Sequence, residues 1–154
     1  MMHGQSPPAA TESARPQVTR ALTLGVCRHL RNSAVTPLQE FKLGSGRRAD
    51  IAGLDRQGRF TIVEVKSSPA DFHSDAKWPE YLEHADFFYF AVGPAFPLEL
   101  LPAEHGVLVA DRFGAAVIRA AEERPINANR RRHQTLRFAR QAAANLIDAV
   151  DPNI

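Results

Sequence analysis

The stretch "IVEVKSS", residues 62–68, reads as a strand of the protein interior that carries two charges. Its isoleucine and two valines are residues that a buried strand favours. Glu64 and Lys66 lie two positions apart, and side chains at that spacing point to the same face of a strand. An acid and a base on one face predict that this face leaves the core here and becomes a site.

The turn before this strand defines the residues that lie opposite it. The segments "RRADIAGL", residues 47–54, and "RFTIVEVK", residues 59–66, flank a loop that ends in Gly58. A three-residue loop with Gly58 in the left-handed conformation pairs residues whose numbers sum to 114. A loop of two or four residues would instead turn Asp50 to the other face. With the three-residue loop, one face carries four opposed pairs: Leu54–Phe60, Ala52–Ile62, Asp50–Glu64 and Arg48–Lys66.

Two carboxylates face to face, followed by two cations face to face, are unfavourable for stability. A divalent metal between Asp50 and Glu64 would resolve the first conflict, because Mg²⁺ takes oxygen ligands and often only one or two protein carboxylates. A phosphate near Arg48 and Lys66 would resolve the second. Metal, lysine and phosphate are the parts of metal-assisted phosphodiester hydrolysis. The alternative is an ordinary solvated strand end, with diagonal ion pairs among the same four residues.

Patterns elsewhere predict an α/β fold, with a mixed β-sheet flanked by α-helices. Apolar residues at helical spacing predict one helix over 16–31 and another over about 129–149. Pro37 indicates that the first strand lies at or near a sheet edge, and "FFYF", Phe87–Phe90, is expected in the core. The expected strands are residues 34–43, 47–54, 59–66, 86–92, 106–111 and 115–121, with a helix that starts at Ser68 after the third.

The chain has 154 residues, which is enough for one domain with a core. We expect a disordered leader over residues 1–15 and a single domain over residues 16–150. The lone Cys27 excludes a disulfide framework and favours a reducing compartment. No apolar run approaches the roughly 20 residues of a membrane span. The expected location is therefore the cytoplasm, associated with the nucleoid, with no membrane as a partner.

At the hairpin the chain resembles the PD-(D/E)XK nuclease superfamily, which has a restriction-endonuclease-like core. The shared pattern is an Asp, a strand turn and then Glu-x-Lys, after a leading helix. The longer run of residues 46–92, with "GVLVAD" and "TLRFARQAA" further on, looks like the MmcB-like DNA repair family of alphaproteobacteria. This resemblance covers nearly everything after the leader. It implies a metal-dependent nuclease fold and a role in DNA damage repair.

The resemblance also implies roles for single residues. Asp50 and Glu64 would be the metal carboxylates, the Val65 backbone carbonyl a further ligand, and Lys66 the catalytic lysine. The expected cofactor is Mg²⁺ or Mn²⁺. Members of the superfamily often add an acid from the first helix, but residues 16–31 contain none. Glu40 is the expected replacement, and the alternative for it is a surface glutamate.

Basic residues near this hairpin and in the last helix are the candidates for contacts to DNA. The last helix is rich in arginine, and no acid lies between Glu123 and Asp148. A basic stripe there would contact the DNA backbone, and the alternative is a solvated helix end. Trp78 either stacks on a base or packs in the core. The candidate DNA-binding residues are Arg47, Arg48, Lys77, Trp78, Arg130, Arg131 and Arg132.

Residues that follow the hairpin have simpler expected roles. Asp71 is expected to cap the short helix that starts at Ser68, whereas Asp75 and Lys77 are placed at the border of the site. His73 and His84 are expected at the surface, so no zinc site is predicted.

Together these observations predict a metal-dependent DNA nuclease that acts in DNA damage repair. A non-cleaving DNA-binding or scaffolding module that keeps the fold is the alternative. A nuclease that acts on RNA also stays open, because nothing in the sequence reads the 2′-hydroxyl. The expected partners are DNA and either a second copy of the chain or a repair protein.

Overall fold

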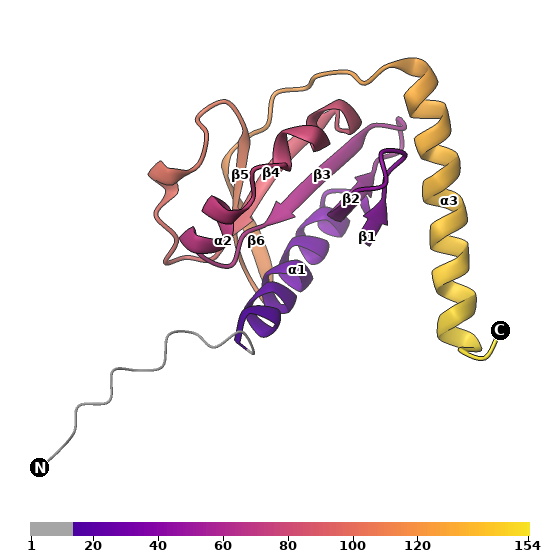
Figure 1. Ribbon diagram of the computed structural model, residues 1–154, viewed down its shortest axis with the longest axis horizontal. Coiled ribbons are helices and arrows are strands. Elements are labelled where there is room, and N and C mark those ends of the chain that lie inside the picture. The colour runs from indigo at the N-terminus through magenta and orange to yellow at the C-terminus, as the bar shows by residue number, and fades with distance from the viewer. Residues whose placement is uncertain (1–13) are drawn as a thin grey trace, which may run out of the picture.

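The structure is a computed structural model, and it describes residues 14–154. A six-stranded mixed sheet is flanked by helices (Figure 1). In chain order the elements are α1 (Ala14–Asn32), β1 (Thr36–Lys42), β2 (Arg48–Leu54), β3 (Phe60–Val65), α2 (Pro69–Ser74), the 3₁₀ helix η1 (Trp78–His84), β4 (Phe87–Val92), the 3₁₀ helix η2 (Leu98–Leu100), β5 (Gly106–Asp111), β6 (Gly114–Arg119) and α3 (Ala128–Val150).

The strands follow one another across the sheet in chain order. β1, β2 and β3 form an antiparallel meander, β3, β4 and β5 run parallel, and β6 returns antiparallel to β5. The predicted α/β fold and mixed sheet are thus confirmed. Pro37 lies in β1, which is an edge strand, as expected for a residue that has no backbone N–H to donate.

Helix α1 covers one face of the sheet. Leu22, Val26 and Leu30 lie four residues apart, so they share one side of the helix. They pack against the side chains of β2, β3, β4 and β5 that point to this face, including Ile51 and Val63. Burial of this apolar stripe fixes α1 beneath the sheet.

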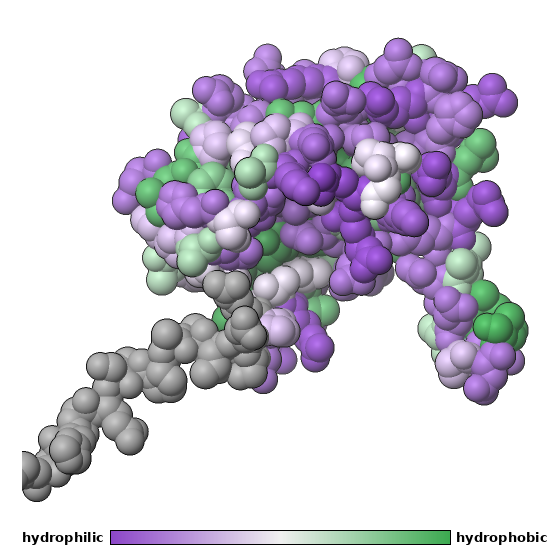
Figure 2. Space-filling model, viewed as in Figure 1, coloured by the Kyte–Doolittle hydropathy of each residue, from purple (hydrophilic) through white to green (hydrophobic). Residues whose placement is uncertain are grey.

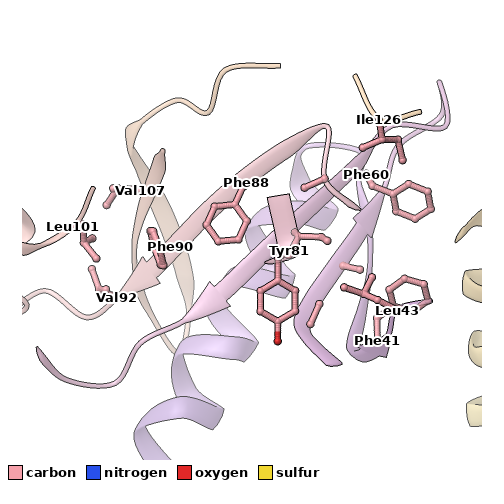
Figure 3. Close-up of a cluster of buried hydrophobic side chains, with 14 of the residues drawn as sticks. Phe41, Leu43, Phe60, Tyr81, Phe88, Phe90, Val92, Leu101, Val107 and Ile126 are labelled. Atoms are coloured by element: carbon pink, nitrogen blue, oxygen red, sulfur yellow. The ribbon is translucent and has the colours of Figure 1, made fainter. Parts of the chain in front are cut away.

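The other face carries a second, mostly aromatic cluster (Figure 3). The rings of Phe41 and Phe60 are stacked with centroids 6.5 Å apart, and Phe138 of α3 meets both edge-on. Phe88 and Phe90 of β4 are buried in the same cluster. This confirms the expectation that the aromatic run of residues 87–90 belongs mainly to the core.

One buried acid ties α3 to the sheet. The carboxylate of Asp86 accepts backbone N–H groups from Phe60 at 2.7 Å and Ile126 at 3.1 Å. It also holds both terminal nitrogens of Arg131, at 2.9 and 2.5 Å. Because this carboxylate is buried and fully bonded, it determines where the first turns of α3 lie.

Beyond its first half, α3 extends past the β1 edge of the sheet (Figure 1). Leu146 is 68% exposed and Val150 is 73% exposed. In Figure 2 these final turns carry apolar surface. No helix in residues 14–154 is both long and apolar enough to cross a membrane.

One sequence-based expectation is wrong, and another lies mostly outside the described residues. Helix α1 begins at Ala14, two residues before the predicted domain start, and the rest of the predicted leader lies outside the described residues. His73 is exposed as expected, but His84 is buried. Its ring Nδ1 lies 3.1 Å from Oε1 of Gln134, whose amide donates to the His84 carbonyl. A partner fifty residues away on α3 leaves no local sign in the sequence.

Candidate active site

The hairpin of β2 and β3 has the predicted register. Gly58 has φ of +79°, and the backbone N–H of Asp55 donates to the Arg59 carbonyl across the loop. Only a residue without a Cβ adopts such a φ at little cost, so Gly58 fixes the loop length. Four opposed pairs run from Leu54–Phe60 to Ile51–Val63, and in each the residue numbers sum to 114.

Beyond the Ile51–Val63 pair, side chains replace the backbone ladder. The Asp50 N–H donates to Oε1 of Glu64 at 3.2 Å, and the Val65 N–H donates to Oδ2 of Asp50 at 2.8 Å. Each carboxylate thus takes a backbone donor from the opposite strand. The expectation that these two acids meet is confirmed.

The predicted meeting of Arg48 and Lys66 is not observed, because the two strands have separated by that point. Arg48 stays paired with Lys42 of β1, and the Lys66 N–H bonds to the Ala91 carbonyl.

The two carboxyl groups lie in a poorly solvated place. Glu64 is only 4% exposed, and burial together with the nearby charge of Asp50 raises the pKa of Glu64 to about 9. Burial also raises the pKa of Asp50, although a hydrogen bond from the Val65 N–H and another with Glu64 act in the opposite direction. Two acids that compete for one low-dielectric site hold a proton between them at neutral pH.

Lys66 is buried beside this pair and has its own acidic partner. The side chain is 6% exposed, and its Nζ lies 2.5 Å from Oδ2 of Asp75. Burial would raise the pKa of Asp75, but the hydrogen bond from Lys66 and backbone N–H donors outweigh it and lower that pKa. Asp75 therefore carries the charge that fixes the direction of the Lys66 ammonium group. This contact places Asp75 directly beside Lys66, as expected for a residue at the border of the site.

A cleft of about 450 Å³ opens at Asp50, the member of the carboxyl pair that lines it. One wall is α1, through Thr19, Arg20 and Thr23, and the other comes from β1 and from the start of α2. Asp71 lines this cleft and accepts the backbone N–H and the hydroxyl of Ser67. The backbone N–H of Asp71 donates to the hydroxyl of Ser68 at 3.1 Å. The predicted cap at the start of this helix is thus confirmed.

Glu40 lies next to Asp50 across the β1–β2 ladder. Gln39 pairs with Ile51 and Phe41 with Ala49, which leaves Glu40 and Asp50 at the skipped position between them. Glu40 has φ of +52°, a left-handed conformation that is uncommon for a residue with a side chain. Strained backbone of this kind concentrates at functional sites. The Glu40 side chain is 74% exposed and lines the same cleft, with its nearest cation, Arg48, 3.9 Å away.

The donor set fits a hard divalent cation through two carboxylates. Asp50 and Glu64 supply buried oxygens whose mutual repulsion such a cation would relieve, and Mg²⁺ often keeps only one or two protein carboxylates. Among residues 14–154, no three or more Asp, Glu, His or Cys side chains already cluster as a metal site. A ligand set here would therefore need the Val65 carbonyl, water or a moved Glu40 side chain.

The predicted DNA-binding residues fall into two groups. Arg48, Lys77 and Arg132 are exposed, and Arg47 is half-buried in an ion pair with Glu80. Arg130 pairs with Glu83 at 3.4 Å. All five keep cationic groups at or near the surface.

Arg131 and Trp78 have internal contacts instead. Arg131 is occupied by Asp86 and by the Gly58 carbonyl, at 2.6 Å. The Trp78 ring stacks on Phe88 and meets the edges of Phe90 and His105. For Trp78 the structure thus favours the core alternative, because aromatic residues already cover it.

Tyr81, like Trp78, was expected either to stack on a base or to pack in the core, and its contact with the β2 strand was not predicted. Its hydroxyl donates to the Arg48 carbonyl at 2.9 Å, and its ring is part of the buried cluster (Figure 3). Burial and the negative charges of Glu64 and Asp50 raise its pKa to about 12. It thereby supports the strand segment that carries Asp50, and only its place after Pro79 in a short 3₁₀ helix brings it there.

One comparison with known proteins identifies a family for this chain. A model of MmcB-like DNA repair proteins matches residues 6–153, nearly the whole chain. A solved structure, described as the SPO1766 protein of unknown function from Silicibacter pomeroyi, is 43% identical. The match covers 88% of this chain and 93% of that one, with a TM-score of 0.85. No curated protein matches the chain.

Proposed function

The chain belongs to the MmcB-like family of DNA repair proteins, and from this premise we propose that it is a metal-dependent DNA nuclease of the PD-(D/E)XK type. The observation that carries the proposal is the pair of carboxyl groups of Asp50 and Glu64, joined at the open end of a hairpin. Lys66 lies beside them, buried and held. Outside catalysis, this burial of charge has no evident benefit for the fold, because apolar residues would cost less there.

The proposed metal ligands are the carboxylates of Asp50 and Glu64 and the carbonyl of Val65. When bound, Mg²⁺ or Mn²⁺ would lower the pKa of a water molecule and offset the charge of the scissile phosphate. The two acids supply the charge that holds the ion. Their raised pKa values mean that binding must displace a proton, so the site should fill more readily as pH rises.

Lys66 is the proposed catalytic cation. Its ammonium group would stabilise negative charge on the attacking water or on the phosphate in the transition state. Asp75 restricts where this group can point, and a fixed donor in a site with little water stabilises developing charge more than a mobile one. Arg48 is exposed at the start of β2, two residues before Asp50, and it would contact a phosphate next to the one that is cut. Arg47 would do so if it leaves its ion pair with Glu80.

A non-cleaving DNA-binding module is the second candidate. It is favoured by the lack of a third clustered carboxylate in the described part of the chain, and by the engagement of Lys66 with Asp75. In that case the buried pair would hold a proton permanently. A partner, either a second copy of the chain or a repair protein, stays an expectation for both candidates.

Cleavage of labelled DNA distinguishes the two candidates. The purified chain is incubated with single-stranded, duplex, flap and abasic DNAs and one RNA, in Mg²⁺, Mn²⁺ or EDTA. Glu64→Gln and Lys66→Met remove the proposed ligand and the proposed cation with little change in shape. Glu99→Gln is the matched control, because Glu99 is an exposed acid on η2.

Metal-dependent cleavage that survives Glu99→Gln but falls at least about a hundredfold in both site variants would support the nuclease. Cleavage that persists in the site variants would indicate a contaminating enzyme or another site. No cleavage, combined with salt-sensitive DNA binding in all four proteins, would support the non-cleaving module.

A further inference from the structure

A second hollow lies on the other side of the β1–β2 turn, between that turn and the first half of α3. Its volume is about 870 Å³. We call it the α3 groove, and the residues that define it are Gly44, Ser45, Arg130, His133, Arg137 and Arg140. In Figure 2 the surface around the first turns of α3 is predominantly hydrophilic.

Three arginines of the groove form one stripe along α3, with His133 among them. Residues 130, 133, 137 and 140 are spaced by three or four positions, so they lie on the same side of the helix. Ten residues of helix extend about 15 Å. Over that length one strand of DNA presents about four phosphates, since its charges are roughly 3.4 Å apart along the axis. The stripe thus has the dimensions of a short run of nucleic-acid backbone.

Most of this charge has no acidic partner within residues 14–154. Glu83 is the one acid that lines the groove, and it lies 3.4 Å from Arg130. Arg137 and Arg140 form no ion pair among the described residues. Two guanidinium groups left without acids on one wall of a groove attract a polyanion, and their planar forks match the oxygens of phosphate.

The groove has a fixed wall and an open rim. Arg131 anchors α3 through Asp86, and Gln134 at the base of the groove is bonded to His84. A Cβ on Gly44 would lie 3.6 Å from Nε of Arg137. Because glycine has no side chain, the guanidinium group of Arg137 stays accessible on this side of the groove. A preformed cationic wall loses little conformational freedom when an anion binds.

The β1–β2 turn links the groove to the carboxyl pair. Gly44 and Ser45 line the groove, and the same chain continues through Arg47 and Arg48 to Asp50. Six residues of extended chain span at most about 20 Å. A strand of DNA that follows this edge would therefore pass Arg47 and Arg48 between the groove and the proposed centre.

We propose that the α3 groove binds the sugar–phosphate backbone of DNA, independently of sequence, on the stretch of strand that lies beyond the proposed cleavage site. The inference rests on the proposed function only for the direction in which the DNA strand runs, from the groove to the proposed cleavage site. The groove itself is a binding surface whether or not the chain cleaves. A DNA strand fits better than an acidic peptide, because its evenly spaced phosphates match the length of the stripe and the planar guanidinium groups of its arginines.

The test is a DNA-binding titration in EDTA, where no cleavage occurs. A fluorescent 20-nucleotide DNA, single-stranded or duplex, is titrated with the full chain at several salt concentrations. The groove variant is Arg137→Gln with Arg140→Gln. The matched control is Arg28→Gln with Arg112→Gln, which removes two exposed arginines from α1 and from the β5–β6 turn.

The groove variant should bind DNA at least about tenfold more weakly at low salt, and the slope of log K against log salt should be smaller by about 1.5. The control should match the original chain, and Arg137→Lys with Arg140→Lys should keep most of the slope. Equal affinity and slope in the groove variant and the control would overturn the proposal. So would the absence of DNA binding by the original chain, or displacement of DNA by polyglutamate at equal charge concentration.

Two further arms separate this proposal from the nuclease. Glu99→Gln should bind DNA in EDTA as well as the original chain does, because Glu99 is an exposed acid on η2 that lines neither cleft. If no DNA is cleaved but the groove variant binds DNA weakly, the proposal for the groove is supported and the proposal of a nuclease is wrong. If the groove variant cleaves DNA normally and binds it with unchanged affinity, only the proposal for the groove is wrong. An RNA of equal length that binds much more tightly than DNA would overturn the assignment to DNA.

Discussion

Lys66 and Asp75 form an ion pair in which Nζ and Oδ2 are 2.5 Å apart and the lysine is 5% exposed. The pair joins the end of β3 to the segment after α2, nine residues further on. A lysine side chain that is this buried has little contact with solvent, so its direction depends on Asp75. The proposed centre thus includes a residue that would touch neither the metal nor the phosphate.

We predict that Asp75→Asn slows cleavage about 10–100-fold and leaves DNA binding in EDTA unchanged. The amide keeps the size of the side chain but removes the charge that orients Lys66. Loss of the charge should also destabilise the fold by about 1–3 kcal/mol, because a buried cation is left without its partner. Asp75→Glu should recover part of the activity. If Asp75→Asn cleaves as fast as the exposed-site control Asp148→Asn, the positioning role is wrong.

The carboxyl pair predicts an unusual dependence of stability on pH. The pKa of Glu64 is raised to about 9 in the folded chain, against about 4.3 in an unfolded one. Between these values the folded state holds a proton that the unfolded state has released, so the free energy of unfolding falls as pH rises. Glu64→Gln has no ionisable group at this position, so it lacks this dependence on pH. Without metal, the melting temperature of Glu64→Gln relative to that of the original chain should rise by at least about 3 °C from pH 5 to pH 9.

Thermal melts in EDTA at four or five pH values test this. The gain of Glu64→Gln over the original chain should grow steadily with pH and be smallest near pH 5. A difference that is the same at every pH would show that Glu64 is ionised in the folded chain like an ordinary acid.

Asp86 predicts the opposite dependence. Burial would raise its pKa, but hydrogen bonds from Arg131 and from the Phe60 and Ile126 N–H groups outweigh it and lower that pKa. The stabilisation is therefore present above about pH 4 and is lost as pH falls through the lowered pKa of the folded state. Asp86→Asn should cost about 3 kcal/mol at pH 7, because Arg131 is left without its acid.

Urea unfolding at pH 7 and near pH 3 measures both effects of Asp86→Asn. The deficit of the variant should shrink at the acid end, where the original carboxylate is itself protonated. An equal deficit at both pH values would mean that packing, and not the charge, is what Asp86 contributes.

Trp78 is the single tryptophan of the chain, so its fluorescence reports on its role directly. Because Phe88, Phe90 and His105 already cover its ring, DNA should leave its emission nearly unchanged. Trp78→Phe should keep most DNA affinity and lose about 1–3 kcal/mol of stability. Strong quenching by DNA would favour the stacking alternative.

The hairpin was predictable because its determinants are local. One glycine fixes the loop, the loop fixes the register, and a period of two fixes the face on which Asp50 and Glu64 meet. The opening of the ladder beyond Ile51 was not predictable. It results from carboxylates that accept backbone N–H groups of the opposite strand. Rules for strand pairing consider only hydrogen bonds between backbone groups, so they do not predict such contacts.

Contacts between distant parts of the chain explain the remaining differences. In the sequence Arg131 cannot be told from the neighbouring arginines. In the structure Asp86, 45 residues earlier, binds its guanidinium group and holds it against the sheet. His84 is buried because Gln134, 50 residues later, satisfies its ring. A pattern read along one helix identifies a basic stripe, and only the sheet behind it decides which members face solvent.

The central claim is that Asp50 and Glu64 hold a divalent metal, and Mn²⁺ binding measured by electron paramagnetic resonance tests it most directly. Free Mn²⁺ gives a signal that bound Mn²⁺ loses, so the titration needs neither DNA nor cleavage. The account predicts one site per chain, which strengthens between pH 6 and pH 8.5 and is lost in Asp50→Asn and Glu64→Gln but kept in Glu99→Gln. No binding at millimolar Mn²⁺, or binding that both site variants retain, would contradict it.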